Sequence, residues 1–410
     1  MKPKTFVMLF VLLCILASIT FFILNREKPS SKISQMGEML FGDLPLNDIS
    51  IVQISSYEKD SLQTFKLKRS GSEWVVEDLF DFPANFKSIS ELVSKLKESK
   101  IGRQFEGSPE ALSRLALHDP DQTDISHDEK AIRIQLLGKD QNSLADVLVG
   151  KQRESSGGEG AQYLKSTGEN TVYLVDQTFW FVGKQPQDWI KTELLDIPSN
   201  DIETITCIDP TDQSVIYTVK RPEKGASPQF HPPVDNKPIK SRTVELLFDA
   251  LSSLRVQDVA GTLPEVSGEI TGFGILPYLD FQLFDGRLYR VYPGKEAEAK
   301  QGGYYLKIEV FHVKPENDVK ESADENSEET AAKSMAQMDN EARKNNDSKN
   351  ISQVEINPEE RAIEAYNLNR KLSQWLYIIS DWEHQSLVTD PEAFFEDKDG
   401  NGNDQNPKTY

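Results

Sequence analysis

Residues 88–96 read Ser-Ile-Ser-Glu-Leu-Val-Ser-Lys-Leu, and the other sequence patterns are arranged around this stretch. Its apolar residues recur at i, i+3, i+4 and i+7: Ile89, Leu92, Val93 and Leu96. That spacing predicts an amphipathic helix with one buried side. Ser88 followed by Glu91 is a capping-box pattern, which predicts where the helix begins. A second helix is expected at Ser108-Pro109-Glu110, because proline is favoured in the first helical turn.

Strand patterns lie on both sides of this helix. Apolar and polar residues alternate with period two in short runs: 49–54, 64–68 and 73–76 before the helix, and 131–136, 147–149, 163–164 and 171–175 after it. Such alternation predicts strands with one buried face. The expected fold class is α+β, with antiparallel sheets and packed helices.

The same order of elements returns in the second half of the chain. Val244, Leu247, Phe248 and Leu251 each stand 155 positions after a helix residue of the first half, and Val256 keeps that offset from Ile101. The turn 117–120 corresponds to Gly274-Ile275-Leu276-Pro277. Gly150 and Tyr163-Leu164-Lys165 correspond to Gly294 and Tyr305-Leu306-Lys307. This order predicts two repeated modules, 48–198 and 199–410, although any two amphipathic helices look alike.

Two parts of the second module look unlike folded protein. Residues 318–350 hold nine acidic and five basic side chains with almost no large apolar ones, so we expect a disordered or loosely helical insertion. The polar tail 397–410 is expected to fray. By contrast, Trp375 to Ile379 predicts a strand.

The N-terminus carries an uncharged apolar run. Thr5 to Leu24 are 20 such residues, and a helix of that length spans about 30 Å, the thickness of a bilayer core. We expect an uncleaved single-pass anchor over 1–28 and a tether over 29–47. A cleaved signal peptide and a buried helix are the alternatives. Basic residues flank the run almost equally, so charge counting leaves the topology open.

The composition of the chain and the motifs that it lacks argue against several classes of function and kinds of site. With 46 basic and 66 acidic side chains, the net charge of −20 disfavours nucleic-acid binding. Two cysteines exclude a disulfide framework and a cysteine-rich metal site. The sequence contains no phosphate-binding glycine loop, no His-Glu-x-x-His zinc motif and no serine-nucleophile elbow.

The remaining chemical candidates each have a plain structural interpretation. Cys207 lies in an alternating strand and is expected to be a buried thiol, not a nucleophile. The pairs His118-Asp119 and His127-Asp128 border an acidic loop that could hold a divalent ion but is expected to be solvated. The glycines of 157–160 are expected in a hairpin loop. Residues 397–402 match half of a calcium loop, but Lys408 stands where its glutamate is needed, which favours an acidic tail.

Aromatic side chains are the last candidates. Trp74, Trp180, Trp189, Tyr304 and Tyr305 could line a carbohydrate-binding face, but core packing is the default expectation. No catalytic, cofactor-binding or metal-binding residue is therefore assigned, and no cofactor is expected.

These elements together resemble the family of domain of unknown function 4340 across roughly residues 48–310. The matching motifs are Trp74-Val75, Phe82-Pro83-Ala84-Asn85, the turn ending in Pro120, Gly150 and Tyr163-Leu164, then Phe273-Gly274-Ile275-Leu276-Pro277, Gly294 and Gly303-Tyr304-Tyr305-Leu306. The second module departs from the family pattern at Pro228-Gln229-Phe230 and Ile239-Lys240, and the first lacks a Tyr-Gly before Leu117.

The resemblance implies a bacterial envelope protein with its modules outside the cytoplasmic membrane and its N-terminus inside. Many family members accompany ABC-type exporters, including gliding-motility transporters. We therefore expect a non-enzymatic accessory module that contacts a permease or another envelope protein. An envelope scaffold or ligand-binding protein unrelated to transport, and an enzyme with an unrecognised site, are the alternatives.

Overall fold

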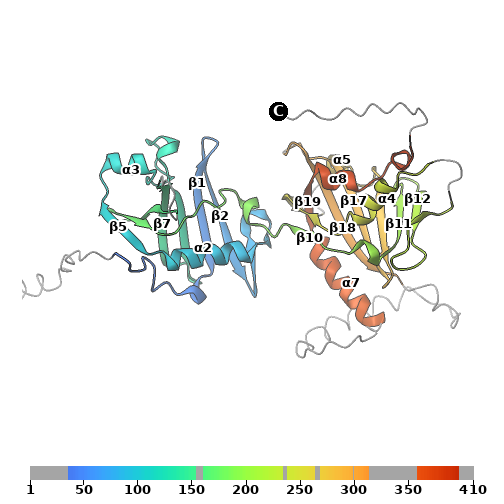
Figure 1. The fold of residues 1–410 in the computed structure, drawn as a ribbon, viewed down its shortest axis with the longest axis horizontal. Coiled ribbons are helices and arrows are strands. Elements are labelled where there is room, and N and C mark those ends of the chain that lie inside the picture. Colours follow the sequence, from blue (N-terminus) through green and yellow to red (C-terminus); the bar gives the residue numbers. More distant parts are fainter. Residues whose placement is uncertain are drawn as a thin grey trace, which may run out of the picture. The chain divides into compact units, whose positions relative to one another are not determined.

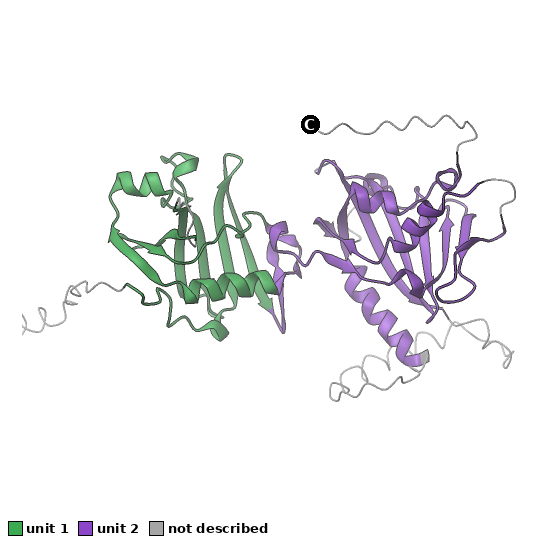
Figure 2. Cartoon of the chain, in the orientation of Figure 1, with its two compact units in different colours: residues 1–69, 87–185 green, residues 70–86, 186–410 purple. Residues whose placement is uncertain are grey.

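The computed structural model describes residues 36–153, 160–233, 238–263, 268–298, 300–313 and 358–396. The chain divides into two compact units, of which unit 1 comprises residues 1–69 and 87–185, and unit 2 comprises residues 70–86 and 186–410 (Figure 2). The units do not coincide with the expected modules, because 70–86 and 186–198 fall in unit 2.

Among its described residues, unit 1 is one antiparallel sheet with the two α-helices α2 and α3 (Figure 1). Its strands lie in the order β2-β1-β6-β7-β8-β9-β5. The elements are η1 (Leu46–Asp48), β1 (Ile51–Glu58), β2 (Ser61–Ser70), α2 (Phe86–Glu98), β5 (Ile101–Glu106), α3 (Pro109–Leu115), η3 (His127–Glu129), β6 (Ile132–Leu137), β7 (Ser143–Gln152), β8 (Gln162–Ser166) and β9 (Thr171–Val175), where η marks a 3-10 helix.

Hydrophobic burial confirms the helix and strand predictions in unit 1. Helix α2 crosses the strands and buries all four predicted residues, with Leu92 0% and Leu96 1% exposed (Figure 1). The sheet contributes a face of buried side chains: Val52, Ile54, Phe65, Leu67 and Ile134. The predicted start of α2 was wrong, since the helix begins at Phe86, before Ser88. Helix α3 begins as predicted, with Ser108 Oγ accepting the Ala111 N–H at 3.2 Å.

Unit 2 contains a second antiparallel sheet, with strand order β13-β12-β11-β16-β17-β18-β19-β15, and the short pair β10–β14. Its N-terminal elements are β3 (Glu73–Val76), η2 (Glu77–Leu79), β4 (Phe82–Pro83), η4 (Pro186–Trp189), β10 (Glu193–Leu195), η5 (Ser199–Asp201), β11 (Ile202–Ile208), β12 (Val215–Lys220) and β13 (Gln229–Phe230). They are followed by α4 (Ser241–Asp249), β14 (Leu254–Arg255), β15 (Asp258–Thr262), α5 (Gly268–Thr271), β16 (Tyr278–Leu283), β17 (Arg287–Glu296), β18 (Gly303–His312), α7 (Pro358–Leu372), β19 (Trp375–Ser380), α8 (Asp381–Ser386) and η7 (Pro391–Phe394).

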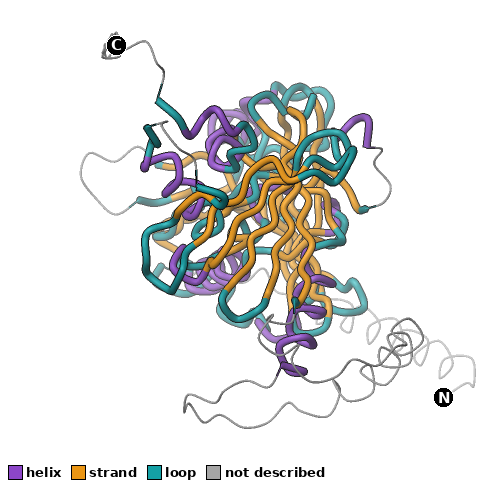
Figure 3. The backbone as a smooth tube through the Cα atoms, turned by 90° about the vertical axis from the view of Figure 1, so that its right-hand side faces the viewer, coloured by secondary structure: helices purple, strands orange, loops and turns teal. Residues whose placement is uncertain are grey.

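The two sheets share one strand order. Each strand in one order has a counterpart at the same place in the other order. The two orders are β2-β1-β6-β7-β8-β9-β5 in unit 1 and β12-β11-β16-β17-β18-β19-β15 in unit 2. In both sheets a strand downstream of the amphipathic helix, β5 or β15, forms the outer edge beside the last strand. In unit 2 the short β14 stands between α4 and β15. Helix α4 buries the predicted residues, with Leu247 and Leu251 both 0% exposed. Figure 3 draws the strands of both sheets in orange and the helices in purple.

Two motif glycines occupy matching positions and have the same physical role. A Cβ atom on Gly150 of β7 would lie 2.5 Å from the carbonyl oxygen of Leu115, at the end of α3. On Gly294 of β17 it would lie 2.6 Å from the carbonyl oxygen of Thr271, at the end of α5. Only glycine allows a backbone to approach a strand this closely.

A further backbone match lies within unit 2. The Asn85 N–H donates to Trp189 O at 2.7 Å, and the Lys240 N–H donates to Phe394 O at 2.8 Å. The neighbouring bridges Ala84–Ile190 and Ile239–Phe395 repeat the pairing. Both aromatic residues end 3-10 helices that begin with proline, η4 and η7.

Several expectations lie outside the described residues: the anchor Thr5–Leu24, the insertion 318–350 and the tail 397–410. The tether 29–47 is described only from residue 36 onward. Among the helices that the structure describes, none is long and apolar enough to cross a membrane.

Candidate functional site

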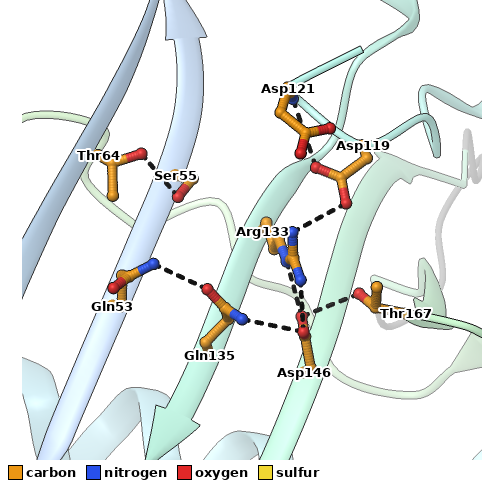
Figure 4. Close-up of polar contacts among 9 residues, drawn as sticks. All are labelled: Gln53, Ser55, Thr64, Asp119, Asp121, Arg133, Gln135, Asp146 and Thr167. Carbon is orange, nitrogen blue, oxygen red and sulfur yellow. Dashed lines mark hydrogen bonds and ion pairs between the residues drawn. The ribbon is translucent and has the colours of Figure 1, made fainter.

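The sheet of unit 1 has a second face that is lined by polar side chains at β1, β2, β6 and β7. We call it the polar face, and its residues are Gln53, Ser55, Thr64, Arg133, Gln135 and Asp146 (Figure 4). They share one face because directly opposed residues of adjacent strands point to the same side. Gln53 opposes Gln135, which in turn opposes Asp146.

Asp146 is the centre of this network. Arg133 Nε and Nη2 donate to its two carboxylate oxygens at 2.9 and 2.6 Å. Thr167 Oγ1 and Gln135 Nε2 donate to the same oxygens at 2.8 and 3.0 Å (Figure 4). Burial opposes ionisation, but these hydrogen bonds outweigh it and hold the pKa of Asp146 below its ordinary value. Four donors fill the acceptor capacity of a carboxylate, so Asp146 is a structural anchor and not a free base.

The network continues to the loop after α3. Arg133 Nη1 donates to Asp119 Oδ2 at 3.1 Å. Burial raises the pKa of Asp119, although the Asp121 N–H and Arg133 lower it in part. Beside this ion pair, Leu115, Leu117, Ala131, Leu148 and Val172 form an apolar cluster under α3 and its loop. The loop therefore covers part of this sheet side and leaves the polar face beside it.

A cleft of about 610 Å³ lies at the neighbouring end of β1, β6 and β7. Its lining mixes four lysines with Tyr57, His127 and three carboxylates. Lys130 Nζ lies 3.6 Å from the centroid of the Tyr57 ring and donates to Pro120 O at 3.3 Å. Lys184 Nζ pairs with Glu58 at 2.6 Å. Such a lining suits polar groups of both charges on a partner.

Unit 2 carries a charged and aromatic set on the corresponding strands. Arg290 of β17 donates from Nε and Nη2 to the two oxygens of Asp280 on β16, at 2.7 and 2.9 Å. The Arg290 guanidinium also lies 4.7 Å from the Tyr278 ring centroid. The hydrogen bonds from Arg290 to Asp280 raise the pKa of Arg290. Tyr292 donates to Glu309 at 2.7 Å.

Cys207 lies where the alternation predicted, fully buried in β11. Its Sγ atom is 3.7 Å from Thr389 O. Burial raises the pKa of the thiol to about 12, so it is protonated at neutral pH and is not a nucleophile.

The histidine pairs do not form a metal site. His118 Nε2 is 3.0 Å from Ser113 Oγ, Asp119 pairs with Arg133, and Asp128 accepts a hydrogen bond from Ser126. Within the described ranges, no group of three His, Cys, Asp or Glu side chains could hold a metal ion. The half calcium loop 397–402 lies outside the described residues.

The structure agrees with some of the expectations for the glycine and aromatic candidates and not with others. Gly160 precedes β8, after a hairpin that leaves β7, as expected, whereas 157 and 158 lie outside the described residues. Trp189 is core, at 1% exposed, but the core expectation for Trp180 was wrong, since it is 77% exposed. Trp74 and Tyr305 are half-buried, and Tyr304 stacks on His384 with centroids 4.1 Å apart.

Sequence reasoning missed the polar face entirely. Each of its residues is an ordinary polar residue in a strand, and only the register brings Gln53, Arg133 and Asp146 together. One sequence signal for the repeat was also overlooked: Pro45-Leu46-Asn47-Asp48-Ile49 returns as Pro198-Ser199-Asn200-Asp201-Ile202. Both copies form a 3-10 turn that leads into the first strand of a sheet.

Comparison with known proteins gives one match. Residues 74–269 match the family model described as "Domain of unknown function (DUF4340)", a narrower range than the motifs suggested. It begins at Trp74 and includes Phe82-Pro83-Ala84-Asn85 and Gly150. No curated protein and no solved structure matches the chain. The chain therefore carries a DUF4340 domain over residues 74–269.

Proposed function

We propose that this protein is a non-enzymatic binding protein of the bacterial envelope, an accessory module of an ABC-type exporter or of another envelope complex. The observation that carries the proposal is the polar face of unit 1. Its charged groups are held by one another, as in the four hydrogen bonds to Asp146, and form a stiff surface. Preorganised polar groups favour recognition, because little ordering is needed when a partner binds.

We also propose that the two sheets are repeats of one module. The shared strand order, the paired glycines Gly150 and Gly294, and the matching backbone bonds at Asn85 and Lys240 support this proposal. A repeated sheet module offers two related surfaces on one chain. When a partner has bound one surface, the effective concentration of the second surface for that partner is raised.

The proposed location is the cytoplasmic membrane, with a single-pass anchor over Thr5–Leu24, the N-terminus inside and the modules outside. The uncharged apolar run and the envelope setting implied by the family resemblance support this topology. An anchor would keep the binding surfaces close to a membrane partner.

Co-purification tests the proposal. Tagged full-length protein is isolated from its native host in mild detergent, crosslinked and analysed by mass spectrometry. We expect a permease or another envelope protein to be recovered with it. Isolation of the protein alone, from cells that express a candidate permease, would contradict the accessory role.

One observation favours a ligand-binding protein as a second candidate. In unit 2, the partly exposed rings of Phe273 and Tyr292 lie 6.1 Å apart, and the buried Tyr278 ring lies 5.2 Å from Tyr292. Rows of aromatic rings bind sugar faces and other flat ligands. Saturable binding of a soluble glycan, lost in Tyr292→Ala but retained in Tyr366→Ala on α7, would favour this candidate.

A further inference from the structure

The edge of the sheet in unit 1 is formed by β5. In the sheet order of the described strands, β5 stands at the end, next to β9, and Figure 1 labels it. Among the residues that the structure describes, those paired with the outer side of β5 reach only its beginning: the Ile101 N–H donates to Glu38 O at 2.9 Å, and Ile101 O accepts from the Gly37 N–H at 2.7 Å. An edge strand presents backbone donors and acceptors on which another strand can be added.

The register shows which residue of β5 faces outward. The Gly107 N–H donates to Asn170 O at 2.8 Å, toward the β9 side. Phe105 opposes Val172 in the same ladder. Inward and outward groups alternate along an antiparallel strand, so the Gln104 N–H and C=O point away from β9. The same alternation turns the N–H and C=O of Glu106 outward, so Gln104 and Glu106 are the positions at which an added strand would pair.

A groove of about 530 Å³ lies beside this position. Phe105 and Tyr163 line it, with ring centroids 6.4 Å apart and an edge-to-face angle of 78°. Arg103 and Arg153, both exposed, also line it. The one carboxylate of the lining, Asp176, already accepts the Lys100 N–H at 2.9 Å. In a chain with a net charge of −20, this local excess of guanidinium groups favours an acidic ligand with apolar side chains.

In unit 2, an acidic and aromatic segment lies beside the corresponding edge. There the outer strand is β15, and η2 lies against it. Residues 77–82 of this segment read Glu-Asp-Leu-Phe-Asp-Phe. Trp375 Nε1 donates to Phe80 O at 3.3 Å, and the Phe82 ring packs edge-to-face on Trp375 at 4.9 Å. An acidic and aromatic segment thus packs beside this edge in unit 2, with its side-chain contacts on Trp375 of the neighbouring strand β19.

We propose that the β5 edge of unit 1, with its groove, binds an extended segment of a partner protein that carries acidic and aromatic side chains. The segment would pair its backbone with β5 at Gln104, place carboxylates near Arg103 and Arg153, and place an aromatic ring beside Phe105. This inference rests on the proposed binding function and names the chemistry of the partner.

A labelled peptide with the sequence of residues 73–83 is the probe, and its fluorescence anisotropy is followed as full-length protein in mild detergent is added. We expect saturable binding that weakens about tenfold or more in R103E/R153E, because like charges then face each other. A peptide with lysines in place of its acidic residues should recover affinity for that variant. The control R242E reverses an exposed charge on α4 and should bind like the parent. Unchanged thermal unfolding shows that the variants are folded.

Equal binding by the parent and R103E/R153E, or no saturable binding at all, would overturn the proposal. The first result would mean that the peptide binds elsewhere, for instance at β15 in place of residues 77–82. Neither result bears on co-purification with an envelope partner, so the two proposals fail separately.

Discussion

Gly150→Ala and Gly294→Ala test whether each sheet is in direct backbone contact with the helix end above it. The added Cβ would lie 2.5 Å from Leu115 O in unit 1 and 2.6 Å from Thr271 O in unit 2, whereas real Cβ atoms stay beyond 3.0 Å. Strand and helix end must therefore separate by about half an ångström. Overpacking of this kind costs about 1–3 kcal/mol, and we expect the upper half of that range because the obstacle is backbone.

Hydrogen exchange measured by mass spectrometry is the assay, because it follows the stability of each sheet separately. A loss of about 2 kcal/mol accelerates exchange through unfolding roughly 30-fold. Gly150→Ala should accelerate exchange in β6 to β9, and Gly294→Ala should do so in β16 to β18.

Gly102→Ala is the matched control. Gly102 is also a strand glycine, but its added Cβ would meet its nearest atom, Leu174 O, at an ordinary 3.4 Å. This substitution should stabilise unit 1 by about 0.4–1 kcal/mol, because alanine restricts the unfolded chain. If Gly150→Ala matched this control, the close approach of α3 to β7 would be refuted.

Three further predictions concern the core, the polar face and the thiol. Leu92→Ala should destabilise unit 1 by about 2–5 kcal/mol in urea unfolding, through lost burial and a cavity, whereas the exposed Leu62→Ala should change stability by no more than about 0.5 kcal/mol. The folded pKa of Asp146 is lowered, so its ionised form stabilises the fold above the ordinary carboxyl pKa of about 3.9, and this contribution is lost as the pH falls through the folded value. Asp146→Asn should therefore lower the free energy of unfolding at pH 7 by about 1–3 kcal/mol and make that free energy less dependent on pH below about 4. The same fall in stability at acid pH in the variant and the parent would count against the ion pair. In a variant lacking Cys14, iodoacetamide should label Cys207 only after unfolding, and rapid labelling of the native protein at pH 8 would refute its burial.

The parts of the fold that depend on local periodicity were predictable from the sequence. The buried residues of α2 and α4 follow from a 3.6-residue repeat, and the start of α3 follows from Ser108 and Pro109. The start of α2 did not follow from the capping pattern at Ser88, because the helix begins two residues earlier, at the exposed Phe86.

The parts that depend on strand register or on distant contacts were not predictable. Asp146 has no special sequence neighbours, and its partners Arg133 and Thr167 reach it only through the ladder and the turn after β8. Trp180 carries no local sign that it is exposed. The assignment of residues 70–86 to unit 2 was equally unpredictable from the sequence, because contacts such as that of Phe82 with Trp375 join residues far apart in the chain.

Site-specific photocrosslinking in the native host tests the binding function most directly. A photoreactive residue is placed at Thr64 on the polar face or, as a matched control, at Ser90 on the helix α2 that covers the opposite face; both positions are exposed in unit 1. The account predicts a crosslinked adduct with an envelope protein from Thr64 and none from Ser90. Equal adducts from both positions, or none from Thr64 at native expression, would contradict it.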